Sequence, residues 1–186
     1  MDRDREIVET DISKIKALSK RKEDENWEFR SFLKESDVPS EEIDRIVNEL
    51  YKETSIKIDC TSCANCCREM QPLLDDEDIE RLSAGLGLSA AQFKKQYLVK
   101  DRESDKFLLK EKPCPFLKDN LCLHYKYRPK DCASYPHLNK EGFIFRLMDV
   151  IHNYSVCPIV FNVYGRLKES VWSERIQNAH KKTKRL

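Results

Sequence analysis

Cysteine is the residue type through which this chain is best equipped to do chemistry, because it has eight cysteines and half of them are clustered. The cluster reads Cys60-Thr-Ser-Cys63-Ala-Asn-Cys66-Cys67, and the remaining cysteines are Cys114, Cys122, Cys132 and Cys157. Two cysteines separated by two residues place their thiols about one tight turn apart, so both can bind the same metal ion. The sequence therefore predicts that all eight cysteines are metal ligands and that bound metal organises the fold.

The spacing within the cluster favours an iron–sulfur cluster over zinc. Cys60, Cys63 and Cys66 are three evenly spaced thiols, and a distant Cys157-Pro158 could supply a fourth. This arrangement is used by proteins that hold a [4Fe–4S] cluster. Zinc sites more often use two separated Cys-x2-Cys pairs, and the second half of the chain has no such pair. Zinc stays the alternative.

The neighbouring residues Cys66 and Cys67 direct their side chains apart, so we do not expect them to share one tetrahedral ion. Eight cysteines also divide evenly into two groups of four. One partition gives a first centre of Cys60, Cys63, Cys66 and Cys157 and a second centre of Cys67, Cys114, Cys122 and Cys132. Spacing alone does not determine this partition, and a structural or reactive thiol within the cluster is an alternative.

Residues near the later cysteines bear on the charge and the ligands of such a site. Four thiolates around Zn²⁺ leave a net charge of about −2, which nearby cations and backbone donors balance. Lys126, Arg128 and Lys130 lie between two of the cysteines and fit this role. The alternative is that they are exposed loop charges. His124 and His137 are also close in sequence to cysteines, but with eight thiols present we do not expect them to be ligands.

Composition argues against a nucleic-acid-binding or membrane protein. The chain has 34 Lys and Arg against 33 Asp and Glu, a net charge of +1, so no field of one sign steers it to nucleic acid. Only residues 180–185 are locally basic, and a solvated helix end is expected there. The charged start predicts no signal peptide, and no stretch approaches the length of a membrane helix. We therefore expect a cytoplasmic protein whose reduced thiols bind metal.

The elements that must position the cysteines are mostly helical. A helix is predicted after Pro39, with Ser40 as its N-cap. The preceding segment, up to about Leu33, is more polar, so a looser and more exposed helix is expected there. After the cluster come two short helices, the first capped by Asp75 or Asp76 and ended by Gly85-Leu-Gly87. The second starts after Ser89 and extends to about Val99 as an αα-hairpin with the first.

Short apolar runs at 107–109 and 143–145 predict small strands. A final helix is expected beyond Pro158, with an inner stripe of Val160, Val163, Tyr164, Leu167 and Val171. The predicted fold is α-rich α+β, in which helices enclose irregular cysteine-bearing metal-binding loops with a small β element. We expect a helical extension at residues 1–56, a cysteine-cluster metal-binding domain at 57–160 and a C-terminal helix packed on it at 161–186.

Five motifs carry a resemblance to a known family. They are the cluster Cys60 to Cys67, Cys114-Pro-Phe-Leu117, Cys122-Leu-His-Tyr125, Arg128-Pro-Lys-Asp-Cys132-Ala-Ser-Tyr135-Pro136 and Cys157-Pro158. On these motifs the chain resembles the YkgJ-type cysteine-cluster family of zinc- or iron-chelating domains, over roughly residues 58–160 and with every cysteine included. It departs from the family's pattern at Ala64, where Gly is common, at Ala133, where Arg is common, and at Ile159, where Gly is frequent.

The resemblance implies metal chelation, and the family has one enzymatic relative, flagellin lysine N-methylase. The leading interpretation is an iron–sulfur or zinc protein with a redox or iron-sensing role. A protein lysine methylase-like enzyme that uses S-adenosylmethionine is an alternative, although no Gly-rich turn after a strand is found to hold that ligand. A zinc-stabilised module that recruits a protein partner is a third possibility. The sequence leaves open whether the protein is an enzyme.

Overall fold

A computed structural model describes residues 8–172 of the chain. These residues form two units, each described by itself below. The helical unit comprises residues 8–59 and 136–172, and the cysteine unit comprises residues 60–135. Helices dominate both units and the strands are short, so the predicted α-rich α+β fold class is confirmed. The division into segments 1–56, 57–160 and 161–186 stays a prediction.

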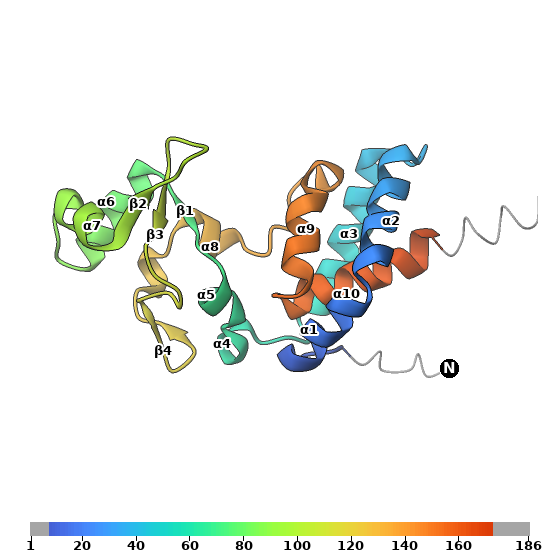
Figure 1. Cartoon of the computed structure of the whole chain (residues 1–186), viewed down its shortest axis with the longest axis horizontal. Helices are drawn as coiled ribbons and strands as arrows, with labels where there is room; N and C mark the ends of the chain where they lie inside the picture. Colours follow the sequence, from blue (N-terminus) through green and yellow to red (C-terminus); the bar gives the residue numbers. More distant parts are fainter. Residues whose placement is uncertain (1–7, 173–186) are drawn as a thin grey trace, which may run out of the picture. The chain divides into compact units, whose positions relative to one another are not determined.

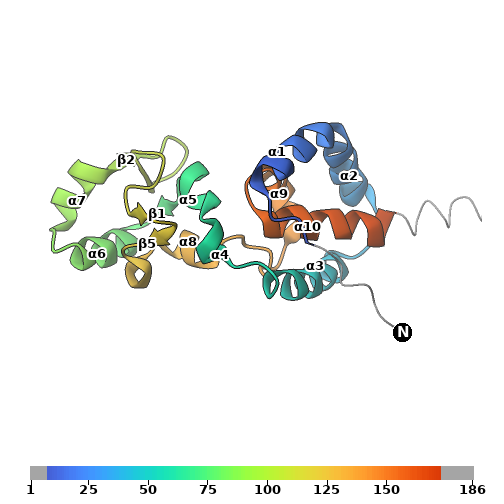
Figure 2. The same cartoon turned by 90° about the horizontal axis from the view of Figure 1, so that it is seen from below.

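The helical unit is organised around α10 (Figure 1). Its elements are α1 (Ile12–Arg21), α2 (Glu23–Glu35), α3 (Ser40–Ser55), η2 (Phe143–Arg146), α9 (Leu147–Tyr154), α10 (Pro158–Leu167) and the π-helix η3 (Lys168–Trp172). Figure 2 shows α10 running between α3 on one side and α1 and α2 on the other. The apolar stripe expected beyond Pro158 supplies this core, since Val160, Val163, Tyr164 and Leu167 are all buried.

The segment before Pro39 is part of this core, and the expectation of a looser, exposed helix there was wrong. Ile15, Phe29 and Leu33 are fully buried. Phe29 makes an edge contact with Tyr164, their ring centroids 5.3 Å apart, and the Tyr164 hydroxyl donates a hydrogen bond to the carbonyl oxygen of Asn26 (3.2 Å). A few apolar residues at helical spacing therefore suffice to dock a polar helix.

Two local predictions in the helical unit were also wrong. Ser40 is the first residue of α3 rather than its cap, since Pro39 precedes the helix without a capping side chain. Residues 143–145 form the 3₁₀ helix η2 instead of a strand. Gly142 takes a left-handed conformation (φ 74°) before it, and the Asp44 carboxylate accepts hydrogen bonds from the backbone N–H groups of Gly142 (2.7 Å) and Phe143 (2.8 Å).

The cysteine unit combines short helices with two small antiparallel sheets. Its elements are α4 (Cys60–Cys63), α5 (Asn65–Glu69), β1 (Leu73–Leu74), α6 (Asp76–Gly85), α7 (Ala90–Tyr97), β2 (Leu98–Lys100), β3 (Phe107–Leu109), β4 (Leu117–Lys118), β5 (Leu121–Cys122), η1 (Tyr125–Tyr127) and α8 (Lys130–Ser134). The first sheet has the order β1–β3–β2, and β4 pairs with β5 as a hairpin.

The predicted αα-hairpin of this unit is confirmed and provides its core. Asp75 caps α6 through the backbone N–H of Asp78, and Ser89 forms a capping box with Gln92 at the start of α7. α7 ends at Tyr97, two residues earlier than expected, where β2 begins. Buried side chains of both helices and the strands pack together in a cluster of Leu74, Ile79, Leu82, Phe93, Leu98, Leu109 and Phe116.

Within residues 8–172, no helix combines the length and the apolar character needed to cross a membrane. The basic segment 180–185 and the end of the predicted C-terminal helix lie outside the described residues.

Candidate metal centre

Four cysteines from separate parts of the cysteine unit lie in one region: Cys67, Cys114, Cys122 and Cys132. Burial raises the pKa of Cys132 to about 12, with further contributions from Asp131 and from charge on the other three thiols. Burial likewise raises the pKa of Cys114 to about 11, and charge on Cys67 and Cys122 adds to it. Every pair of the four thiols is therefore within electrostatic reach of one another. They are the same four cysteines that the sequence grouped as the second centre.

Local structure explains how Cys67 and Cys114 meet. Cys67 belongs to the short helix α5. Ala64, the residue before this helix, has a left-handed backbone conformation (φ 47°). The backbone N–H of Cys114 donates a hydrogen bond to the carbonyl oxygen of Cys67 (2.8 Å), so the two chain segments are directly joined. Glycine tolerates a positive φ best. Ala64 therefore occupies a position whose backbone favours glycine.

Cys114 lies just before a tight hairpin, and Cys122 lies on its second strand. Cys122 on β5 pairs with Leu117 on β4, and Asp119 and Asn120 make the two-residue turn with positive φ angles of 48° and 66°. The backbone N–H groups of Phe116 and Leu117 lower the pKa of the Cys114 thiol, and that of His124 lowers the pKa of the Cys122 thiol, so they oppose the rise that burial causes. The Leu117 N–H also donates a hydrogen bond to the carbonyl oxygen of Cys114 (3.0 Å). Donors of this kind stabilise thiolate ligands around a metal.

Arg68 connects the cluster to that hairpin, and the sequence reasoning missed it. Its guanidinium donates to the carbonyl oxygen of Cys63 (2.9 Å) and to the Asn120 side chain. The Asn120 amide in turn donates to the carbonyl oxygen of Ser62 (3.1 Å). A hydrogen bond from Cys66 lowers the pKa of Cys67 to about 7, and the nearby Arg68 charge contributes to the lowering. The only sequence signal for this role was the position of Arg68 directly after the cluster.

The three cations expected to balance the thiolate charge behave differently from one another. The Arg128 guanidinium stacks on the Tyr125 ring at 3.7 Å and opposes the burial-driven rise in the pKa of Cys122. The ammonium group of Lys130 instead pairs with the carboxylates of Asp75 (3.1 Å) and Glu77. Lys126 is exposed. Arg128 and the unexpected Arg68 are therefore the cations that act on the thiols.

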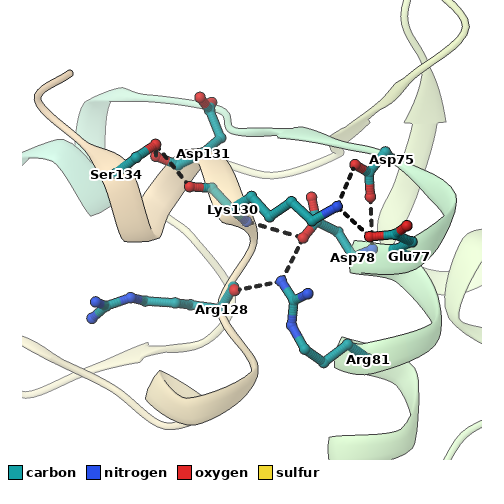
Figure 3. A network of polar contacts seen from close by, with 8 residues as sticks. All are labelled: Asp75, Glu77, Asp78, Arg81, Arg128, Lys130, Asp131 and Ser134. Atoms are coloured by element: carbon teal, nitrogen blue, oxygen red, sulfur yellow. Dashed lines mark hydrogen bonds and ion pairs between the residues drawn. The ribbon is translucent and has the colours of Figure 1, made fainter. Parts of the chain in front are cut away.

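Cys132 lies on α8, which a polar network joins to α6 (Figure 3). The backbone N–H of Lys130 donates to the Asp78 carboxylate (3.0 Å), and Arg81 donates to the carbonyl oxygen of Arg128 (3.0 Å). The Asp131 carboxylate accepts from the N–H of Leu73 (3.3 Å), which ties α8 to β1. The residue Cys132 is exposed overall, yet burial of its thiol governs its pKa, so the sulfur lies among protein atoms.

The structure does not add the other four cysteines to this group. Cys60 and Cys63 lie one turn apart on α4, with Cys60 exposed and Cys63 half-buried, and Cys66 is half-buried on α5. Cys157 is buried in the helical unit, directly before α10. A centre that combines these four therefore stays a prediction, as does the expectation that His124 and His137 are not ligands.

The donor set of the four grouped cysteines fits a thiolate-bound metal or iron–sulfur cluster in kind. All eight cysteines of the chain are thiols, and backbone donors and two arginines serve the group. As the side chains stand, no three Cys, His, Asp or Glu residues within 8–172 are arranged so that they could hold a metal ion.

Comparison with known proteins adds one finding. The model of the CxxCxxCC family, described as "putative zinc- or iron-chelating domain", matches residues 59–157. Comparisons with curated proteins and with solved structures found no match.

Proposed function

Because the match covers more than half of its length, the chain belongs to the CxxCxxCC family of zinc- or iron-chelating domains, and from this premise we propose that Cys67, Cys114, Cys122 and Cys132 together bind one metal centre. The observation that carries the proposal is that four thiols from α5, the loop before β4, β5 and α8 lie within electrostatic reach of one another, with the backbones of Cys67 and Cys114 hydrogen-bonded (2.8 Å). Four thiolates are a complete donor set for a zinc ion or for a [4Fe–4S] cluster.

The surroundings of the four thiols support binding of a cation. Burial raises the pKa values of Cys114, Cys122 and Cys132, so thiolates there are costly unless a positive charge is bound. Backbone N–H groups from Phe116, Leu117 and His124 already lower the pKa values of two of the thiols. A bound metal would replace the thiol protons, and these donors would then stabilise the remaining negative charge.

The metal is proposed to be iron in a [4Fe–4S] cluster, with zinc as the alternative. The four grouped thiols suit both forms, and the iron–sulfur form is preferred because the evenly spaced Cys60, Cys63 and Cys66 next to Cys67 are typical of iron–sulfur proteins, although they lie outside the proposed centre. An iron–sulfur cluster supplies one-electron redox chemistry, which would give the protein a role in electron transfer or in sensing iron. The chain's own contribution is to hold the four thiols and to place Arg68 and Arg128 where their charges act on them.

Metal analysis of the protein purified without oxygen tests the proposal. Iron, zinc and acid-labile sulfide are measured per chain, together with the visible spectrum, for wild type and for Cys122→Ser. Leu123→Ser is the matched control, because it makes the same replacement at an exposed neighbouring position. We expect the Cys122→Ser variant to lose the metal of this centre and the Leu123→Ser variant to keep it.

A Cys63→Ser variant distinguishes one centre from two. If two centres exist, Cys63→Ser and Cys122→Ser each remove about half of the metal; if only the proposed centre exists, Cys63→Ser leaves the metal in place. Full metal content in Cys122→Ser combined with its loss in Cys63→Ser would refute the assignment of the four ligands.

The other two functions considered from the sequence make different predictions. A methylase-like enzyme would bind S-adenosylmethionine, so a titration that leaves both spectrum and thermal stability unchanged counts against it. A zinc-stabilised interaction module would be colourless and would lose helicity when a chelator removes the metal. Reversible bleaching by dithionite would instead support the redox role.

A further inference from the structure

We propose that one face of α6 positions Cys132 in the metal centre by holding the segment Tyr127–Lys130, which leads into α8, in a fixed register. The inference rests on the proposed function, because Cys132 is one of the four proposed ligands. Three residues of α6 form this face: Asp78, Arg81 and Gly85. Their spacing of three and four residues places them on one side of the helix.

Asp78 holds the end of the segment nearest to Cys132. Its side chain is only 2% exposed, and it accepts hydrogen bonds from the backbone N–H of Lys130 (3.0 Å) and from the Arg81 guanidinium. A buried carboxylate needs such donors, because its burial without them is costly. Figure 3 shows the carboxylate between its two donors. The backbone two residues before Cys132 is therefore attached to α6.

Arg81 holds the middle of the segment. The same nitrogen of its guanidinium that contacts Asp78 also donates to the carbonyl oxygen of Arg128 (3.0 Å). A hydrogen bond to a backbone carbonyl does not depend on the identity of the side chain it serves. Arg81 thus sets the position of the chain at Arg128, whose own guanidinium remains beside Tyr125 and acts on Cys122.

Gly85 holds the start of the segment by leaving room for an aromatic ring. A Cβ atom at this position would lie 2.5 Å from Cδ2 and 2.6 Å from Cγ of Tyr127, so the ring packs directly on the helix backbone. Asp78, Arg81 and Gly85 contact Lys130, Arg128 and Tyr127, respectively. The two chain segments therefore run in opposite directions. Two hydrogen bonds and one packing contact therefore fix the position of the segment Tyr127–Lys130 along α6.

Such an external guide is needed because α8 is too short to define its own position. It has five residues, and a helix of that length is not stable alone. Asp131 adds one contact to β1, but the approach from Cys122 to α8 is held by α6. Asp78, Arg81 and Gly85 are positioning residues, because they act on Cys132 through the segment before it.

The test measures how well bound metal protects each cysteine. Wild type, Asp78→Asn, Gly85→Ala and Asp76→Asn are purified as full chains without oxygen, and their metal content is determined. The metal-bound proteins are then treated with N-ethylmaleimide, and the alkylation rate of each cysteine is followed by mass spectrometry of its peptide. Asp76→Asn is the matched control, because Asp76 lies on the same turn of α6 but pairs with Lys94 (2.9 Å).

We expect Cys132 to be alkylated about 10-fold to 100-fold faster in Gly85→Ala, the range typical of lost support for a metal ligand. A smaller increase is expected in Asp78→Asn, whose amide oxygen can still accept from Lys130 and Arg81 but carries no charge. Cys67 and Cys114 should stay protected, and Asp76→Asn should match wild type. Gly85→Ala covers the case in which Asp78→Asn fails to fold, because alanine favours the helix itself. Unchanged protection of Cys132 in Gly85→Ala, or equal exposure of all four thiols, would overturn the inference. A wild-type protein without metal would refute the proposed function instead.

Discussion

Zinc binding at the proposed centre should release about three protons at pH 7.5, because three of the four thiols are protonated before the metal arrives. The perturbation is the addition of Zn²⁺ to the metal-free protein. Zinc binds thiolates rather than thiols, so each protonated ligand must give up its proton on binding. The number of protons therefore reports how many of the ligands are buried thiols.

The magnitude follows from the environment of each sulfur. Burial raises the pKa of Cys114 to about 11 and that of Cys132 to about 12, and it also raises the pKa of Cys122. The hydrogen bond from Cys66 lowers the pKa of Cys67 to about 7, so roughly three quarters of this thiol is already ionised at pH 7.5. Zinc affinity should thus increase about 1,000-fold per pH unit above pH 7 and more steeply below it, where Cys67 is also protonated.

Calorimetry can count these protons directly. Zn²⁺ is titrated into the metal-free protein under argon in two buffers with different enthalpies of ionisation. The difference between the two binding heats, divided by the difference between the buffer enthalpies, is the number of protons released. Cys122→Ser should release about one proton fewer, and Leu123→Ser should match wild type. Release of about one proton or none per zinc ion would refute the reasoning, because the ligands could not then be the buried thiols.

Three further predictions concern stability and are measured by urea denaturation of the metal-free chain. Ala64→Gly should raise the free energy of unfolding by up to ~1 kcal/mol, since it relieves a left-handed residue (φ 47°), and a lower value would contradict this. Asp44→Ala should lower it by about 2 kcal/mol through loss of the η2 cap, while exposed Glu41→Ala on the same helix should not. Burial lowers the pKa of Lys168 in the folded protein. Between this lowered pKa and the usual pKa of lysine, the unfolded chain binds more protons than the folded chain, so the free energy of unfolding rises with pH in that window. Lys168→Met should lack this alkaline rise, and an equal rise in both proteins would disprove its origin in Lys168.

Local sequence patterns predicted those elements whose determinants are also local. The caps at Asp75 and Ser89 were confirmed, because a capping side chain and the N–H group it serves lie within a few residues. The strand expected at 143–145 was wrong, because a run of three apolar residues gives no hint of the carboxylate that caps this segment. That carboxylate belongs to Asp44, far away in the sequence. A periodic pattern cannot show a contact of this range.

The same distinction holds for the candidate site. The expectation that Cys66 and Cys67 would not share one ion led to a partition that placed Cys67 with Cys114, Cys122 and Cys132, and the structure brings these four into one region. The residues that support them were missed, because their roles arise only from folding. Asp78, for example, is one of several acids in the first turn of α6, and its carboxylate is buried against the backbone of Lys130.

The chain order of the two units has a consequence for biosynthesis. The cysteine unit is one continuous stretch, whereas the helical unit is built from the segments on either side of it. During synthesis from the N-terminus, α3 therefore emerges long before its packing partner α10, and the cysteine unit is complete in between. The four thiols proposed to bind one metal are therefore all synthesised before α9 and α10.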